Sequence, residues 1–129
     1  MELRKLIKKG SEHKVFCQDF IYADKINNII AAGVFDGCSQ VEDSQFASNL
    51  FGKIFRQNLE ILKNSGLILI DVEQIALTQI YCFFKSVAKI KKELSLINND
   101  LMSTAIFLFY NENYKEGIIY SFGDGYVKF

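Results

Sequence analysis

Apolar residues at helical spacing run without a break through the second half of the chain. They follow one another in steps of three or four residues: Val72, Ala76, Ile80, Phe83, Val87, Ile90, Leu94 and Ile97. A stripe of this period favours a long amphipathic helix. Asp71 and Gln74 have the spacing of a capping box at its start, and the polar residues 98–100 end the pattern. We therefore expect a helix that begins after Asp71 and buries one face against another layer.

A second helix is expected just before this one. Residues 46–62 carry apolar side chains at helical spacing, with polar residues between them. Asp43 or Ser44 would serve as the N-cap, and the Asn-Ser-Gly sequence at 64–66 would stop the helix. The chain thus predicts two long helices, one directly after the other.

Segments with β character flank the two helices. They occupy residues 15–20 and 29–35 before the helices, and residues 104–110 and 118–122 after them. The first of these is short, and Asp19 would lie at its end. The later pair is separated by a polar stretch, which is typical of a hairpin, and residues 126–129 would start another strand. The predicted fold is α+β in the order β-β-α-α-β-β, with two long helices on one face of an antiparallel sheet.

Composition excludes several classes of protein. A chain of 129 residues predicts one domain, and a content that is 50% hydrophobic and 14% aromatic is unlike that of a disordered chain. Basic and acidic residues are balanced at 15 each, without the basic excess typical of nucleic-acid binders. No apolar run approaches the roughly 20 residues that a membrane-spanning helix needs. We expect neither nucleic acid nor a membrane as a partner.

Cysteine usage and the N-terminal segment point to the cytoplasm. The three cysteines are an odd number without CxxC spacing, so neither a zinc site nor a disulfide framework is indicated. Free cysteines fit a reducing compartment. Residues 1–9 are charged and lack the apolar core of a signal peptide. A cytoplasmic location is therefore expected.

Four short patches combine expected strand ends with carboxylates or small polar residues. They are Cys17-Gln18-Asp19, Asp36-Gly37-Cys38-Ser39, Met102-Ser103-Thr104-Ala105 and Gly123-Asp124-Gly125. Carboxylates beside glycines suit hard cations held by oxygen ligands. Each patch also has an ordinary interpretation, because Asp-Gly and Gly-Asp-Gly are common turn sequences. Cys38 would need His13, the sole histidine, as its base, and otherwise it is a small buried residue.

The order of the four patches resembles the N-terminal half of the type 2C metal-dependent serine/threonine phosphatases. That family opens with a basic residue four places before an acid-or-amide–Asp pair, matched here by Lys14 and Gln18-Asp19. Its Asp-Gly strand end is matched by Val34-Phe35-Asp36-Gly37-Cys38-Ser39, as in bacterial members. Two long helices intervene in the family, as they are expected to do here. The family's Gly-Ser-Thr-Ala strand and Gly-Asp-Ser turn are matched by residues 102–105 and 123–125.

The resemblance implies a four-layer αββα sandwich, of which residues 1–129 would form part as a single partial domain. It also implies Mg²⁺ or Mn²⁺ ions, a pair with a weaker third one, and a phosphoprotein substrate. Asp36 would bridge the metals and the Gly37 carbonyl would ligate one of them. Asp19 would orient metal-bound water. Asp124 would help hold the third metal.

The remaining implied roles go to residues beside the metals. Lys14 would meet the substrate phosphate, at a position where the family usually has Arg; lysine is a point charge without the guanidinium fork. Gln18, Cys38 and Thr104 would support the site, and Cys38 stands where many members carry His. The implied activity is hydrolysis of phosphate monoesters on Ser and Thr by a metal-activated water.

The family continues for about as many residues again and carries further metal-binding aspartates there, so the chain alone is expected to be weakly active or inactive. A homodimer through the sheet face that the rest of the domain would cover is also expected. Two alternatives remain: a non-catalytic remnant that acts as a binding or regulatory module, and an unrelated α+β interaction domain.

Overall fold

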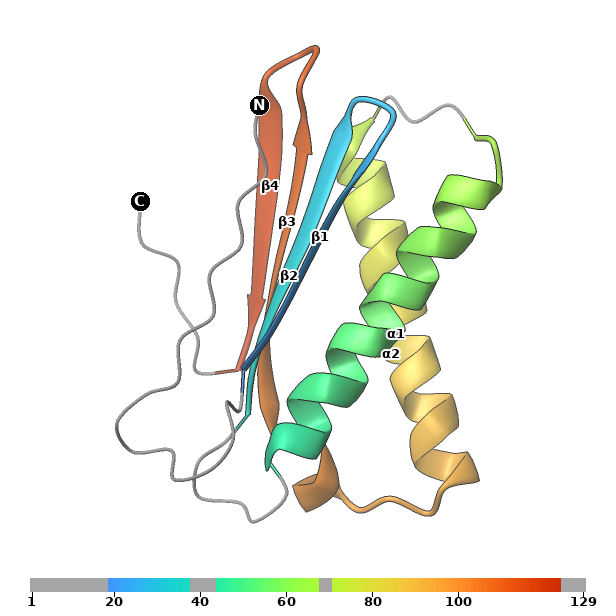
Figure 1. Ribbon diagram of the computed structural model, residues 1–129, viewed down its shortest axis with the longest axis vertical. Helices are drawn as coiled ribbons and strands as arrows, with labels where there is room; N and C mark the ends of the chain where they lie inside the picture. Colours follow the sequence, from blue (N-terminus) through green and yellow to red (C-terminus); the bar gives the residue numbers. More distant parts are fainter. Residues whose placement is uncertain (1–18, 38–43, 68–70, 124–129) are drawn as a thin grey trace.

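Four antiparallel strands form one sheet, and in the sequence two helices separate its second strand from its third (Figure 1). The structure is a computed structural model, and it describes residues 19–37, 44–67 and 71–123. In chain order the elements are β1 (Asp19–Ile26), β2 (Ile29–Gly37), α1 (Ser44–Asn64), α2 (Val72–Glu93), the 3₁₀ helix η1 (Asn98–Leu101), β3 (Ser103–Asn111) and β4 (Glu116–Phe122). The α+β class and the predicted β-β-α-α-β-β order are confirmed.

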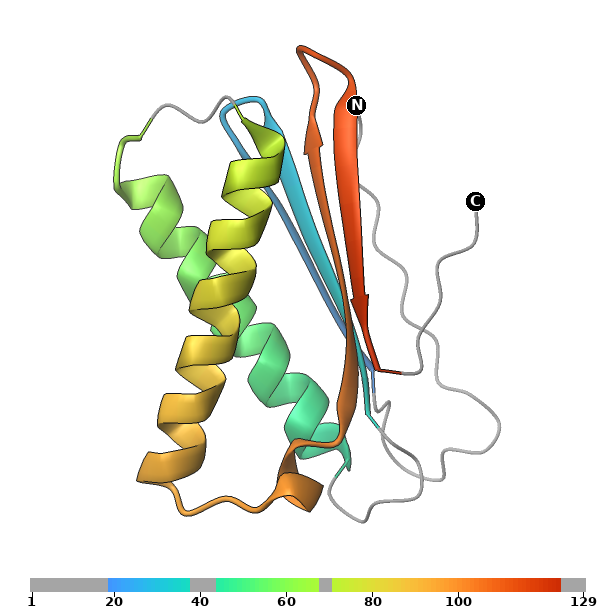
Figure 2. The ribbon, with the colours of Figure 1, turned by 180° about the vertical axis from the view of Figure 1, so that it is seen from behind.

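The sheet has the strand order β1-β2-β3-β4, so the helices leave β2 and return to its neighbour β3. Both helices lie on the same face of the sheet, as the front and back views show (Figures 1 and 2). The described residues therefore form two layers of the four that the family resemblance implies. Neither α1 nor α2 has the length and hydropathy needed to cross a membrane; this finding covers the described residues only.

Phenylalanine rings fill the space between the two layers. Phe35 of β2 stacks on Phe83 of α2 at 5.8 Å between ring centroids and meets Phe107 of β3 edge-on at 5.6 Å. Phe51 and Phe55 of α1 contact the same ring. All of these side chains are buried. Aromatic pairs of this kind add about 0.5–1.5 kcal/mol each beyond their area burial, so the cluster fixes both helices to the central strands.

Alternate residues of each strand point away from this core. The strand residues that pack with the helices are Phe20 and Tyr22 of β1, Ala31 and Phe35 of β2, Phe107 and Phe109 of β3, and Ile118 and Tyr120 of β4. Because neighbours along a strand point to opposite faces, the intervening side chains lie on the other face. They include Ile21, Ala23, Ala32, Val34, Ile106, Leu108 and Ile119. We call this set the open face, because no described helix covers it (Figure 2).

Two sequence expectations need correction. Asp19 was expected to end the first strand, but in the structure β1 runs from Asp19 to Ile26. Residues 15–18 of the predicted strand lie outside the described residues, as do residues 126–129. The second helix was expected to reach Ile97, but α2 ends at Glu93 with Leu94 as C-cap. Ser95 then takes a positive φ of 53°, which turns the chain out of the helix.

Candidate functional site

Three of the candidate residues lie side by side at one end of the sheet. The register pairs Asp19 of β1 with Asp36 of β2, and Asp36 with Thr104 of β3. Directly opposed residues on antiparallel strands share a face, with Cβ atoms about 4.5–5.5 Å apart. All three residues alternate with core-facing neighbours, so they lie on the open-face side. The sheet thus brings together residues that are 85 positions apart, from Asp19 to Thr104.

Gly123 continues this arrangement to the fourth strand. Its φ of +91° lies in the left-handed region that favours glycine. A Cβ atom at this position would lie only 3.1 Å from Cγ2 of Thr104 and 3.3 Å from its Cα. The chain therefore leaves β4 in close contact with Thr104. We call Asp19, Asp36, Thr104 and Gly123 the strand-end row.

Hydroxyl groups of β3 hold the backbone at Asp36. The Ser103 Oγ lies 2.9 Å from the Thr104 carbonyl oxygen and 3.1 Å from the Asp36 carbonyl oxygen, and its single proton can be donated to either. The Thr104 Oγ1 donates to the Asp36 carbonyl oxygen at 3.5 Å. Ser103 is also the cross-strand partner of Gly37. The Asp36 side chain itself is exposed. Its carboxylate is therefore presented to solvent from a backbone whose carbonyl oxygen lies within hydrogen-bond distance of two hydroxyl groups of β3.

The role of Ser103 was not predicted as part of the site. It lies in the patch 102–105 that the sequence singles out, but only Thr104 was given a role there. Its position opposite Gly37 depends on the pairing of β2 with β3. A hydroxyl residue beside a candidate threonine was the one signal available, and it could equally have been ordinary strand sequence.

Four of the candidates cannot be placed relative to this row. Lys14, Gln18, Cys38 and Asp124 lie outside the described residues. Gln18, Cys38 and Asp124 are sequence neighbours of Asp19, Gly37 and Gly123 respectively. Their proposed roles stay predictions.

The donors in the row suit a hard cation. Asp19 and Asp36 supply carboxylate oxygens from adjacent strands, and backbone carbonyls lie beside them; Mg²⁺ and Mn²⁺ prefer such oxygen ligands. Across residues 19–37, 44–67 and 71–123, no group of three or more His, Cys, Asp or Glu side chains could hold a metal ion. The described carboxylates thus fit a hydrated ion, which keeps several of its waters, better than a fully enclosed one.

Comparison of the chain with protein-family models, with curated proteins and with solved structures gave no match.

Proposed function

We propose that this chain is the N-terminal part of a type 2C-like, metal-dependent phosphatase domain that hydrolyses phosphate monoesters on Ser and Thr of phosphoproteins in the cytoplasm. The observation that carries the proposal is the strand-end row. Asp19, Asp36 and Thr104 come from separate sequence patches, and all three are cross-strand neighbours at one end of one sheet face. A chance match to four short motifs would not require the matched residues to be neighbours in the fold.

In the proposed site, Asp36 would hold the divalent ions through its carboxylate oxygens and the Gly37 carbonyl would ligate one of them. Asp19, on the neighbouring strand, would orient metal-bound water. Such ions, when bound, would supply a water of lowered pKa and positive charge for the phosphoryl oxygens. Thr104 keeps the end of β2 in place through its bond to the Asp36 carbonyl. Lys14 brings a positive charge to the phosphate, Asp124 helps to hold a third ion, and Gln18 and Cys38 support the site.

The chain alone should bind Mn²⁺ weakly and turn over slowly. Two divalent ions carry four positive charges, and the two carboxylates of the row balance only part of that charge. If the second ion is held only loosely, a metal-bound water would keep a higher pKa and little hydroxide would be available at neutral pH. We expect hydrolysis of p-nitrophenyl phosphate far below the roughly 1–10³ per second of typical enzymes.

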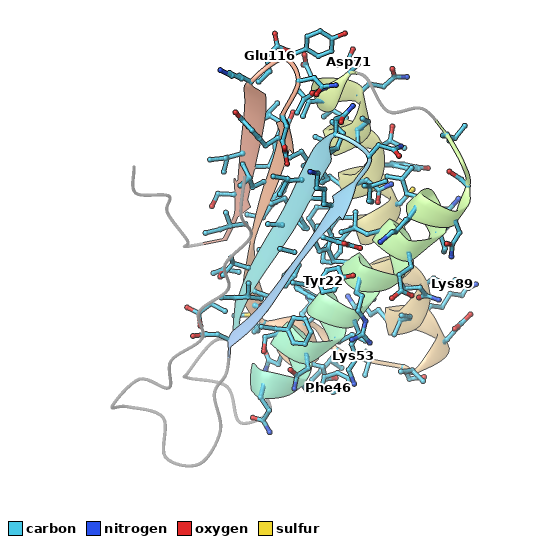
Figure 3. All side chains as sticks on the ribbon, turned by 45° about the horizontal axis from the view of Figure 1, so that its top comes forward. Tyr22, Phe46, Lys53, Asp71, Lys89 and Glu116 are labelled. Carbon is cyan, nitrogen blue, oxygen red and sulfur yellow. The ribbon has the colours of Figure 1, made fainter. Side chains whose placement is uncertain are left out.

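The test measures Mn²⁺ binding by calorimetry and p-nitrophenyl phosphate hydrolysis with added Mn²⁺. Asp36→Asn should weaken Mn²⁺ binding at least tenfold and remove the Mn²⁺-dependent hydrolysis. Glu116→Gln is the matched control, because it removes an exposed carboxylate at the opposite end of the sheet, next to the β3–β4 turn (Figure 3). Equal binding by the parent and Asp36→Asn would remove Asp36 from the site. Mn²⁺ binding that depends on Asp36, without any hydrolysis, would favour the non-catalytic binding module instead.

A further inference from the structure

The outward face of α2, on the side opposite the sheet, is divided along its length into an apolar half and a basic half. Ala76, Ile80 and Phe83 hold the inward face in the core. Helical spacing turns another set of side chains away from them: Leu77, Tyr81, Phe84, Lys85, Ala88, Lys89 and Lys92. All of these residues are exposed, and we call them the outer stripe.

Three large apolar side chains occupy the first half of the outer stripe. Leu77, Tyr81 and Phe84 are 51%, 67% and 41% exposed. Single apolar residues at a protein surface are ordinary, but three on adjacent turns of one helix face form a continuous patch. The Phe84 ring also packs edge-on against Phe122 of β4, at 5.0 Å between ring centroids. The fold therefore fixes part of the patch in place, so a partner would not have to order it on binding.

Lysines occupy the second half of the outer stripe. Residues 85–92 contain four lysines and no acidic residue, although the whole chain is balanced at 15 basic and 15 acidic residues. Within the described part of the chain, neither Lys85 nor Lys92 forms an ion pair, and the Lys89 Nζ lies as far as 4.0 Å from the Glu93 carboxylate. Figure 3 shows the Lys89 side chain pointing away from the body of the molecule. The second half thus presents positive charge that the described residues leave largely unbalanced.

The two halves together favour an acidic polypeptide as the partner. A second copy of α2 would bring the same excess of lysine, and like charges across an interface are unfavourable. A helix that lies in a bilayer surface keeps apolar side chains along its whole length, whereas the large ones here stop at Phe84. Nucleic acid would use the lysines but leave the apolar half in water. An acidic chain with apolar side chains satisfies both halves.

The backbone chemistry of α2 indicates the conformation of that partner. The N–H and C=O groups in the middle of a helix bond to one another, so they offer no hydrogen bonds to an extended chain. A polypeptide bound along the stripe must pair its own backbone groups, and a helix does so. We infer that the outer stripe binds an acidic amphipathic helix of a partner protein. Its apolar side chains pack against Leu77, Tyr81 and Phe84, and its carboxylates pair with the three lysines of the stripe.

The first measurement uses a synthetic alanine-based peptide of about 18 residues, which is long enough to form a helix. Glutamates at helical spacing fill its first half, and leucines on the same face fill its second half, because acidic residues stabilise the N-terminal end of a helix. The control peptide has lysine in place of each glutamate. Fluorescence anisotropy with the full chain should show saturable binding of the glutamate peptide, at least tenfold tighter than that of the lysine peptide. Added salt should weaken this binding, because it screens charges at a surface.

A charge reversal tests the basic half. Lys85→Glu should weaken the glutamate peptide at least tenfold and strengthen the lysine peptide, and a misfolded variant could not produce that gain. Lys53→Glu is the matched control, because it makes the same change at an exposed position of the other helix, α1 (Figure 3). It should leave the preference for the glutamate peptide unchanged.

A truncation tests the apolar half. Tyr81→Ala should weaken the glutamate peptide at least tenfold without a change in melting temperature, because most of this side chain lies in solvent. Ile61→Ala is the matched control, because it removes a side chain of α1 that is 62% exposed. It should leave peptide binding unchanged.

Several outcomes would overturn the inference. Equal binding of the two peptides, or no binding of either, would contradict a site for an acidic helix. Binding to phosphatidylserine vesicles or to duplex DNA that is lost in Lys85→Glu, without peptide binding, would assign the lysines to a membrane or to nucleic acid. A lower mass of Lys85→Glu than of the parent in light scattering would assign the stripe to a second copy. None of these results depends on Mn²⁺ or on phosphate hydrolysis, so the inference can fail independently of the proposed function.

Discussion

At the scale of single residues, Gly52 allows α1 to lie directly against β1. A Cβ atom at this position would fall on the ring of Phe20. In the sequence, Phe20 directly follows Asp19, a member of the strand-end row. Alanine is the better helix former by about 0.5–1 kcal/mol, so propensity alone would make Gly52→Ala stabilising. We expect the reverse, a loss of about 1–3 kcal/mol in unfolding free energy from overpacking, measured by urea denaturation.

A double-mutant cycle isolates this contact. In a Phe20→Ala background the ring is absent, so Gly52→Ala should no longer be destabilising and should recover the helix propensity of alanine. A Gly52→Ala variant more stable than the parent protein would contradict a contact between α1 and the Phe20 ring of β1.

At the scale of secondary-structure elements, Asp71 determines where α2 begins. Its Oδ1 accepts from the backbone N–H of Glu73 at 3.0 Å and of Gln74 at 3.3 Å, and it lies at the exposed start of the helix (Figure 3). Asp71→Ala should lower the unfolding free energy by about 0.5–2 kcal/mol in thermal or urea denaturation. Asp71→Ser is the control, because a serine hydroxyl can also cap, and it should keep most of the stability. An equal loss in both variants would contradict a capping role.

The elements that sequence predicted well are those with a local signal. The cap at Asp71, the period of α2 and the polar stretch between β3 and β4 all lie within a few residues of the structure that they determine. The spacing of apolar residues predicts that a helix forms, but it does not predict the residue at which the helix stops packing against the sheet. Leu94 and Ile97 continue the period, yet they are 60% and 61% exposed. The helix has ended at Glu93, Leu94 is its C-cap, and Ile97 follows the turn at Ser95.

The predicted first strand, residues 15–20, missed most of β1 because charges interrupt the apolar pattern of residues 21–26. Asp24 and Lys25 occupy adjacent positions inside the strand, and each is paired with a residue distant in sequence. Lys63 of α1 lies 3.6 Å from Asp24, and Glu112 lies 3.2 Å from Lys25. Pairs of this kind depend on the tertiary fold and leave no trace in local periodicity.

The candidate site was predictable only in part for the same reason. The short turn at 27–28 between β1 and β2 places Asp19 opposite Asp36 as a local consequence of the hairpin. Thr104 joins them only because β3 returns beside β2 after both helices. The family resemblance implied that these three residues belong to one site, whereas the spacing of apolar residues along the chain carries no such information. The same return of the chain brings the Ser103 hydroxyl within hydrogen-bond distance of the Asp36 carbonyl oxygen.

At the scale of the whole molecule, the two faces of the sheet are unequal. One face holds the phenylalanine core under α1 and α2, while the open face carries Ile, Val, Leu and Ala with no described helix over it (Figure 1). Val34 near its centre is 37% exposed, whereas Ile30 on the same face is buried. The other aliphatic side chains of this face, Ile21, Ile106, Leu108 and Ile119, are half-buried. At normal strand spacing and rise, a face four strands wide and about eight residues long covers roughly 500 Å². That is close to the roughly 600 Å² per partner at the lower end of specific interfaces.

This imbalance leads us to expect a homodimer that buries the open face. Apolar surface on one continuous sheet face favours association, because each copy removes the other's aliphatic side chains from water. Light scattering at high micromolar concentration should give the mass of a dimer or a larger species.

Leu108→Glu places a charge on the open face and should shift the protein to a monomer without loss of fold. Leu77→Glu makes the same change at an exposed position of α2, 51% accessible to solvent, and should leave the dimer intact. A parent protein that stays monomeric throughout would contradict the expectation, and a mass lowered equally by both variants would place the interface elsewhere.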